Sequence, residues 1–353
     1  MSSKLQSPVQ FGRLSLKNRI IMAPMTRSRG GADGTATPLM AQYYGQRASA
    51  GMIISEGVQP SADGKGYMAT PGIYTEAQIA SWQPVTEAVH AKGGTMVMQI
   101  MHCGRVGHPD NKDPGAETVA PSAIKAEGEI FTPNGMKDFI EPRALTLSEI
   151  DVVIAQYRQA TENAYAAGFD GVELHCTSGY LPAQFLATGS NQRQDQYGGS
   201  VENRSRFVVE VLAAMASVDG ADRVGLRICP GHPFNGLFDA KPLETFQYFL
   251  SAISNMGLAY LHAIKSPIEE IDVIELATNY FKGPLIINDG FDQDSAENII
   301  TEQQVDAVSF GRFYISNPDL VKRFECDLPL AEMDFDTIYG GEAKGYSDYP
   351  EAV

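Results

Sequence analysis

The sequence predicts a single (β/α)8 TIM barrel that spans residues 1–353, and three observations lead to this fold class. Short apolar runs rich in β-branched residues recur along the chain, as expected for strands buried on both faces of a parallel sheet. Segments with helical periodicity separate these runs. Strand and helix signals alternate eight times without a break, which favours one closed barrel over two smaller α/β domains.

The expected strands are the apolar runs, and the expected helices are the periodic segments between them. In chain order, the strands are Arg19–Pro24, Gly51–Gly57, Thr95–Met101, Gly171–His175, Arg223–Cys229, Leu258–Ile264, Pro284–Asp289 and Ala307–Arg312. The helices are Pro38–Ala48, Glu76–Ala91, Leu147–Ala167, Val201–Ala216, Pro242–Met256, Ile268–Phe281, Asp292–Thr301 and Pro318–Glu325. Several helices carry boundary signals, because Thr75 and Thr146 can cap helix starts while Gly168 and Gly257 can end helices.

The long interval Cys103–Ala144 lies between the third strand and the third helix and holds many Gly and Pro residues. An interval of this length is unusual for a plain connection between a strand and a helix. We expect it to form a capping excursion over the barrel mouth, of which a hairpin is one form.

In a barrel of this class the chemistry gathers at the C-terminal ends of the strands. Polar and charged residues do end or follow the expected strands: Met25-Thr26-Arg27, Glu56, Gln99 with His102, His175, Arg227, His262 with Lys265, Asn288-Asp289-Gly290, and Gly311-Arg312. The last two sets matter most, because the loops after strands seven and eight commonly bind a phosphate group. Gly290 and Gly311 offer backbone amides there, and Arg312 adds a fixed positive charge.

The stretch Gly171–Ser200 is the strongest candidate for a reaction site. An apolar strand delivers His175 at its end, and Tyr180 follows in a long segment that is too polar for a core. Either residue alone is commonly a packing residue of a protein interior. A His and a Tyr together at a strand end, leading into a polar loop, favour a reaction site.

The overall composition excludes several classes of function. The net charge of −16, with an isoelectric point near 4.8, argues against nucleic acid or anionic lipid as a partner. No apolar run approaches the roughly 20 residues that span a bilayer, and the N-terminus lacks the apolar core of a signal peptide. The four cysteines lie far apart, which indicates neither a zinc site nor a disulfide framework. We therefore expect a soluble, cytoplasmic protein without a metal site.

Long segments of the chain closely resemble the old yellow enzyme family of FMN-dependent ene-reductases. The resemblance covers essentially the whole chain in order, and its longest pieces are far more specific than a lone glycine motif. The matching pieces are Lys17–Ile20, Met22–Arg27, Tyr43–Ala48, Gly51–Gly57, Gln99, Gly104-Arg105, Ala120–Ser122, His175–Tyr180, Asn191–Arg206, Arg227, Phe310–Arg312, Asn317–Leu320 and Gly345–Pro350.

The resemblance implies FMN as the cofactor and assigns most of the strand-end residues to it. Thr26 would hydrogen-bond the O4 side of the flavin ring, and Gln99, like Gly57, would meet the pyrimidine edge. Arg227 would sit near N1 and O2, where a fixed cation stabilises the negative charge that collects on reduced flavin. The implied FMN-binding residues are Ala23, Pro24, Met25, Thr26, Gly57, Gln99, His175, Arg227, Asp289, Gly290, Gly311 and Arg312.

The resemblance also implies two half-reactions at one site, in a monomer or a homodimer. NADPH or NADH would reduce FMN and leave, and an electron-poor alkene would take its place. His175 would donate a hydrogen bond to the substrate carbonyl, flavin N5 would deliver hydride to the β-carbon, and Tyr180 would protonate the α-carbon. The implied substrate-binding residues are Thr26, Met101, His175, Ser178, Tyr180 and Tyr346.

Three positions depart from the usual pattern of the family. Ser178 stands where the family usually has the second residue of a His-x-x-Asn or His-x-x-His pair, which shortens the second donor by one bond, about 1.5 Å. This favours a bulkier substrate or another way of anchoring it, unless His175, Thr177 or a water covers the loss. Met101 replaces a Trp and would soften the pocket wall, whereas Gly57 in place of Ala is a minor change.

The sequence leaves other functions open. Lys265 follows the sixth strand and could serve as the Schiff-base lysine of an aldolase, although the resemblance gives it no role. His102, Cys103 and His108 have a spacing that suits no common metal site. The shortened donor at Ser178 also allows a flavin-binding module without efficient turnover, and the same site could isomerise or desaturate a bulkier substrate.

Overall fold

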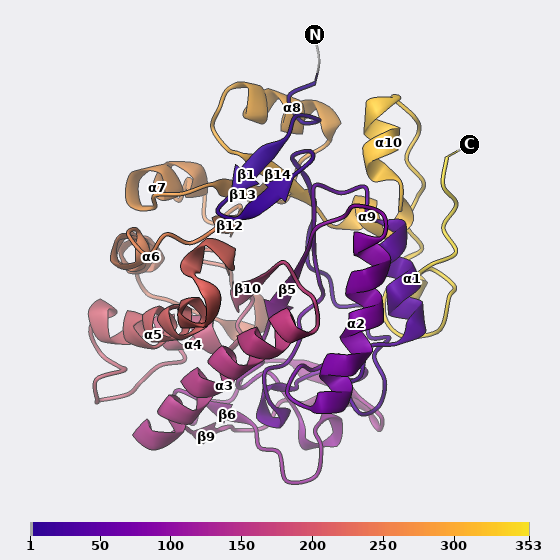
Figure 1. The fold of residues 1–353 in the computed structure, drawn as a ribbon. Helices are drawn as coiled ribbons and strands as arrows, with labels where there is room; N and C mark the ends of the chain where they lie inside the picture. Colours follow the sequence, from indigo (N-terminus) through magenta and orange to yellow (C-terminus); the bar gives the residue numbers. More distant parts are fainter. Residues whose placement is uncertain (1–2, 353) are drawn as a thin grey trace.

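Residues 3–352 are described in a computed structural model, in which eight parallel strands close into a barrel (Figure 1). The barrel strands are β3 (Ile20–Met22), β4 (Met52–Ile54), β5 (Met96–Ile100), β10 (Gly171–Cys176), β11 (Val224–Ile228), β12 (Tyr260–Ile264), β13 (Leu285–Asn288) and β14 (Ala307–Phe310). Each strand pairs with the next one along the chain, and β14 pairs with β3 to close the ring. The predicted barrel and its eight expected strands are confirmed.

Helices lie around the outside of the barrel (Figure 1). Those that match the expected helices are α1 (Pro38–Gln46), α2 (Glu76–His90), α3 (Leu147–Ala166), α5 (Val201–Asp219), α6 (Pro242–Ile253), α7 (Val273–Tyr280), α8 (Gln293–Thr301) and α10 (Leu320–Glu325). Thr75 and Thr146 cap α2 and α3 as predicted. Helix α7 begins later than expected, because the Asp272 side chain accepts the free N–H groups of its first turn. Two short helices, α4 (Leu181–Leu186) and α9 (Arg312–Ser316), were not expected.

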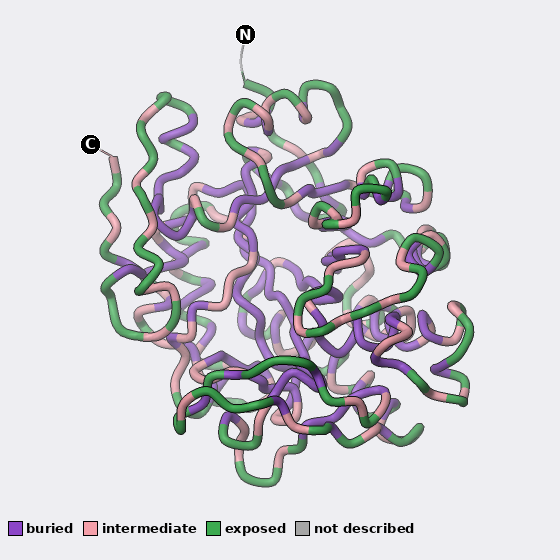
Figure 2. Tube along the Cα trace, turned by 180° about the vertical axis from the view of Figure 1, so that it is seen from behind, coloured by how far each residue is buried: buried purple, intermediate pink, exposed green. Residues whose placement is uncertain are grey.

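Apolar side chains fill the barrel from the N-terminal ends of its strands. The hairpin of β1 (Val9–Phe11) and β2 (Leu14–Leu16) packs there with inward-facing residues of the barrel. A Cβ added at Gly171, where β10 begins, would lie 3.5 Å from Leu14 Cδ1, so the hairpin closes this end. Figure 2 shows mainly buried segments at the centre of the molecule and most of the exposed segments towards its outside. The opposite end, where the polar residues gather, is left for a site.

The interval after β5 forms the predicted excursion and contains a hairpin. Strands β7 (Glu129–Thr132) and β8 (Gly135–Asp138) pair antiparallel, while β6 (Val119–Ala120) and β9 (Arg143–Ala144) pair parallel at its base. Apolar side chains of the excursion form a cluster with Met101 and Tyr180. The excursion therefore lies against the C-terminal ends of β5 and β10, as a cap over the mouth.

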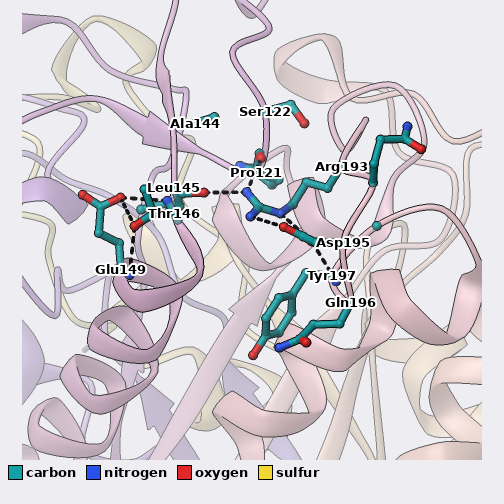
Figure 3. Close-up of polar contacts among 12 residues, drawn as sticks. Pro121, Ser122, Ala144, Leu145, Thr146, Glu149, Arg193, Asp195, Gln196 and Tyr197 are labelled. Carbon is teal, nitrogen blue, oxygen red and sulfur yellow. Dashed lines mark hydrogen bonds and ion pairs between the residues drawn. The ribbon is translucent and has the colours of Figure 1, made fainter.

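Arg193 joins the base of this excursion to the polar segment that follows α4 (Figure 3). Its Nη1 donates to the carbonyl oxygens of Pro121 at 2.8 Å and Leu145 at 2.6 Å, which directly follow the paired strands β6 and β9. Its Nε and Nη2 donate to the Asp195 carboxylate at 3.0 Å and 2.6 Å. Bidentate pairs of this kind fix both distance and angle. The polar segment after α4 thus anchors the excursion that covers the barrel mouth.

Candidate active site

His175 and Tyr180, the pair predicted at the end of β10, lie together in the structure. Their rings meet edge to face with centroids 4.8 Å apart, and each residue is 7% exposed. A tight turn joins them, because Ser178 and Gly179 both adopt left-handed conformations with φ of 55° and 77°. A Cβ at Gly179 would lie 2.7 Å from the Phe234 carbonyl oxygen, so the turn packs closely on the loop after β11.

The protonation state of His175 follows from its surroundings. Burial, together with the positive charge of Arg227, lowers the pKa of His175 to about 3, so the ring is neutral at neutral pH. Its Nδ1 accepts the backbone N–H of Thr177 at 3.4 Å. The single ring proton therefore resides on Nε2, and this N–H can donate to a carbonyl oxygen.

Tyr180 has a polar partner that the sequence did not reveal. The hydroxyl of Tyr67 lies 3.0 Å from the hydroxyl of Tyr180. Burial raises the pKa of Tyr180 well above its usual value, and Tyr67 adds to this effect, so the phenol keeps its proton. Tyr67 is only partly buried and connects Tyr180 towards the surface. It lies in the irregular segment after β4, where neither strand nor helix periodicity marks it.

Met101 and Gly57 fit together at the ends of β5 and β4. A Cβ added at Gly57 would lie 2.6 Å from both Sδ and Cε of Met101. The glycine therefore makes room for the thioether, and two departures from the family pattern form one packing arrangement. Met101 also belongs to the apolar cluster that includes Tyr180.

Arg227 and Gln99 point their polar groups into the barrel near its mouth. Nη2 of Arg227 donates to Asn288 Oδ1 at 2.8 Å, whereas Nη1 is buried and has no hydrogen-bond partner within residues 3–352. Gln99 donates through Nε2 to the carboxylate of Glu173 at 2.7 Å. A buried guanidinium N–H without an acceptor is costly. A ligand that carries an acceptor, such as the N1–O2 edge of a flavin, fits this donor.

A cavity of about 310 Å³ lies where β13 and β14 end. Met25, which follows β3, approaches it, because a Cβ added at Gly311 would lie 3.4 Å from Met25 Sδ. Exposed Arg312 and the Lys265 ammonium, 4.0 Å from the Phe291 ring centroid, bring positive charge to its rim. The lining residues are Asp289, Gly290, Phe291, Ser309, Phe310, Gly311, Arg312 and Phe313. This is where the sequence predicts a phosphate site.

Tyr346, expected to contact substrate, lies in the core instead. It is fully buried and stacks on Tyr43 with ring centroids 4.0 Å apart. The guanidinium groups of Arg27 and Arg29 lie 5.1 Å and 4.4 Å from its ring centroid. Its ring is thus enclosed by side chains, and we withdraw the expected substrate contact.

Tyr339, in the same C-terminal segment, is the residue that reaches the mouth. It is 70% exposed, and the N–H of the following Gly340 donates to the Arg27 carbonyl oxygen at 3.0 Å. Burial is the largest cause of the raised pKa of both Tyr67 and Tyr180, and Tyr339 makes a smaller contribution to it. The hydroxyl groups of Tyr67 and Tyr180, 3.0 Å apart, are thus the two phenols that the structure brings into contact here.

Lys265 and His102, the residues considered for an aldolase and for a metal site, make other contacts in the structure. The Lys265 side chain is exposed and lies over the Phe291 ring. His102 packs in its loop, where Nδ1 accepts the Gly104 N–H at 3.0 Å and the carbonyl oxygen accepts the Leu181 N–H at 2.9 Å. No group of three or more His, Cys, Asp or Glu side chains in residues 3–352 is placed to hold a metal.

Within residues 3–352, every helix is too short or too polar to cross a membrane.

Comparison with known sequences gives matches along nearly the whole chain. The sequence model described as the NADH:flavin oxidoreductase / NADH oxidase family matches residues 4–331. The 12-oxophytodienoate reductase 1 of Oryza sativa subsp. japonica is 36% identical over 98% of this chain and 92% of its own length. The chanoclavine-I aldehyde reductase fgaOx3 of Penicillium roqueforti (strain FM164) is 39% identical over 98% of this chain and 96% of its own.

Solved structures agree with the sequence matches. Morphinone reductase in complex with tetrahydroNAD superimposes with a TM-score of 0.94 and 46% identity, covering 99% of this chain and 98% of the other. The old yellow enzyme homologue from Zymomonas mobilis superimposes with a TM-score of 0.95 and 38% identity, covering 98% of this chain and 99% of the other. The chain therefore belongs to the old yellow enzyme family, the NADH:flavin oxidoreductases that work with FMN and a nicotinamide dinucleotide.

Proposed function

We propose that this protein, acting as one unit over residues 1–353, reduces the activated C=C bond of α,β-unsaturated carbonyl compounds with NADPH or NADH. The observation that carries the proposal is the contact between a neutral His175 and a protonated Tyr180 at one strand end. The imidazole can polarise a carbonyl group, and the phenol can supply a proton. The relatives above that are named reductases accord with this chemistry.

The residues at the barrel mouth fit FMN. The buried Nη1 of Arg227 offers a donor to the N1–O2 edge, and the cavity beside Gly290, Gly311 and Arg312 suits a single phosphate group. FMN bound there would supply the hydride. We assign these further residues to FMN: Ala23, Pro24, Met25, Thr26, Gly57, Gln99, His175 and Asp289.

The chain's own residues orient the substrate and move a proton. Nε2–H of His175 donates to the substrate carbonyl oxygen and draws electron density out of the conjugated alkene. Tyr180 gives its proton to the α-carbon, and the hydroxyl of Tyr67, 3.0 Å away, can hand a proton back. Met101 forms a soft wall of the pocket, and Ser178 occupies the second anchoring position.

Isomerisation or desaturation of a bulkier substrate is the second candidate, favoured by the small side chain at Ser178 and the flexible one at Met101. Assays of the purified protein with cyclic and acyclic enones distinguish this second candidate from the proposed reduction. A reductase consumes one NADPH or NADH per product molecule, whereas an isomerase needs none in net terms. Product formed without net nicotinamide oxidation would refute the proposed reduction.

The buried free thiols of Cys103, Cys176 and Cys229 suit a reducing compartment, and we infer the cytoplasm as the location. Fractionation of source cells, with the protein followed by antibody, tests this location.

A further inference from the structure

A layer of polar side chains crosses the interior of the barrel, between the apolar N-terminal end and the mouth. Gln99, Glu173, His262 and Ser309 are at most 2% exposed and come from β5, β10, β12 and β14. Nε2 of Gln99 donates to Glu173 Oε1 at 2.7 Å, and Nδ1 of His262 lies 2.9 Å from Glu173 Oε2. Nε2 of His262 in turn lies 2.8 Å from the Ser309 hydroxyl.

This layer holds a negative charge on Glu173. Burial alone would raise the pKa of Glu173, but the hydrogen bonds from His262 and Gln99 and the positive charge of Arg227 together hold it below its usual value. Burial lowers the pKa of His262, so the imidazole is neutral and donates through Nδ1. Apolar side chains could fill this layer at less cost, since burying a charge is expensive even when it is hydrogen-bonded. The carboxylate therefore calls for a reason other than stability.

The carboxylate determines the orientation of the Gln99 amide. A carboxylate can only accept hydrogen bonds, so the NH2 group of Gln99 must face Glu173. The Gln99 carbonyl oxygen then points away from Glu173, and no donor within residues 3–352 bonds to it. Arg227, on the neighbouring strand β11, presents its buried and unpaired Nη1. The floor of the mouth thus carries one acceptor and one donor.

We propose that Glu173 is a positioning residue that sets the hydrogen-bonding polarity of the flavin site. By holding the Gln99 amide, it presents a carbonyl oxygen to the N3–H of the flavin pyrimidine, while Arg227 serves the neighbouring O2. The N3–H donor and the O2 acceptor of a flavin match this pair of groups. The inference rests on the proposed binding of FMN at the mouth and adds the residue that orients its pyrimidine edge.

The test uses apo-protein reconstituted with ¹⁵N-labelled FMN, and the readout is the N3–H resonance. In the wild type, a hydrogen bond to Gln99 should shift this proton downfield from its position in free FMN. In Glu173→Gln, the residue at 173 can donate as well as accept, so the Gln99 amide can turn over. The N3–H signal should then move back towards its free position, and FMN should bind about tenfold more weakly, as expected for one hydrogen bond.

Ser55→Ala is the matched control, because it removes the hydrogen bond to the Gln99 backbone N–H but leaves the bond between the Gln99 side chain and Glu173 intact. Its N3–H signal should stay at the wild-type position. Should Glu173→Gln not fold, Glu173→Asp, which draws the carboxylate back from Gln99, gives the same readout.

An N3–H signal at the wild-type position in a folded, FMN-bound Glu173 variant overturns the inference, even if affinity falls. A signal at the free position in the wild type overturns it as well. Failure of wild-type apo-protein to bind FMN at all would instead refute the proposed cofactor site, so the two failures are distinguishable.

Discussion

At the scale of single residues, the candidate site depends on where protons reside. His175 is neutral because it is buried beside the charge of Arg227, and the N–H of Thr177 places its proton on Nε2. Tyr180 keeps its proton because burial raises its pKa. Neither state changes between pH 6 and 8, so the proposed donor to the carbonyl and the proposed proton donor are both in place across that range.

Replacing Tyr180 by Phe removes the proposed proton donor and keeps the ring. Oxidation of the reduced enzyme by an enone should slow by about 10²–10⁴-fold, as for a lost general acid. Reduction by NADPH or NADH should barely change, since it needs no proton from Tyr180. Stopped-flow absorbance separates the two half-reactions. Tyr67→Phe is the matched control: it keeps the phenol of Tyr180 and should slow enone reduction much less. An equal fall in both half-reactions of Tyr180→Phe would point to a structural role.

Replacing Ser178 by Asn should restore a second donor to the substrate carbonyl. The variant should fold, because φ at this position is 55° and Asn tolerates the left-handed region well. Cyclohexenone turnover and affinity for phenol ligands should each rise about tenfold, the value of one neutral hydrogen bond. Ser178→Gly also suits the backbone but adds no donor, and should give no gain. Unchanged kcat/KM and phenol Kd in the Asn variant would mean that Ser178 faces away from the substrate.

Replacing Arg227 by Met removes the cation that we place beside the flavin. The flavin reduction potential should fall and reduction by nicotinamide should slow, because negative charge on reduced flavin loses its partner. Redox titration against a reference dye measures the potential. Asn288→Ala removes the Arg227 partner but keeps the charge, so its potential should shift less. An unchanged potential in a folded, flavin-bound Arg227→Met variant would mean that Arg227 does not lie beside the flavin.

At the scale of elements, helix α1 is joined to strand β4 through a buried carboxyl group. Glu56 follows β4, and its backbone N–H donates to the Tyr44 hydroxyl of α1 at 3.0 Å. The Tyr44 hydroxyl in turn donates to Glu56 Oε1 at 3.3 Å. Burial raises the pKa of Glu56 to about 7, against the opposing effect of Arg27.

This raised pKa predicts a pH dependence of stability. The folded state holds a proton at Glu56 that the unfolded chain, with a pKa near 4.5, releases. The resulting stabilisation is fully present below about pH 4.5 and is lost as the pH rises towards 7. Between pH 5 and 8, wild type should therefore lose about 2 kcal/mol of unfolding free energy relative to Glu56→Gln, which cannot titrate. Urea unfolding of both apo-proteins measures the difference, and parallel pH profiles would contradict it.

Tyr346 belongs to a piece of the chain that matches the family, but the C-terminal segment holds its side chain in the core. Tyr346 packs between Tyr43 of α1 and the guanidinium groups of Arg27 and Arg29. Nη2 of Arg27 also donates to the Gly345 carbonyl oxygen at 2.8 Å. The segment therefore fastens the chain end to α1 and to the loop after β3. Tyr339, upstream of this contact, is left at the mouth.

At the scale of the whole molecule, the cavity at the ends of β13 and β14 is where we propose that a single phosphate group binds. The purified protein should be yellow, and heat denaturation should release FMN and not FAD. The reasons are the cavity of about 310 Å³ beside Gly290 and Gly311 and the lack of a Gly-x-Gly-x-x-Gly strand–helix fingerprint in the sequence. Chromatography of the supernatant identifies the flavin, and FAD there would contradict the prediction.

Elements with a regular period could be predicted from the sequence, and irregular ones could not. All eight barrel strands were foreseen, because a strand buried on both faces leaves an apolar run long enough to recognise. Helices α4 and α9 were missed because each is too short to show a helical period. The start of α7 was placed too early because Ile268 and Ile271 continue its apolar pattern, whereas the cap at Asp272 decides where the helix begins.

The sequence by itself determined the fold and the strand ends at which polar residues gather, including the pairing of His175 with Tyr180. Those signals are local, since each depends on residues close together in the chain. Only the tertiary structure decided which distant side chains complete the site. Tyr67 reaches Tyr180 across 113 positions, and Glu173 meets His262 across 89. Such contacts exist only once the strands have closed into a ring, because closure sets which inward side chains share a layer and which way each one faces.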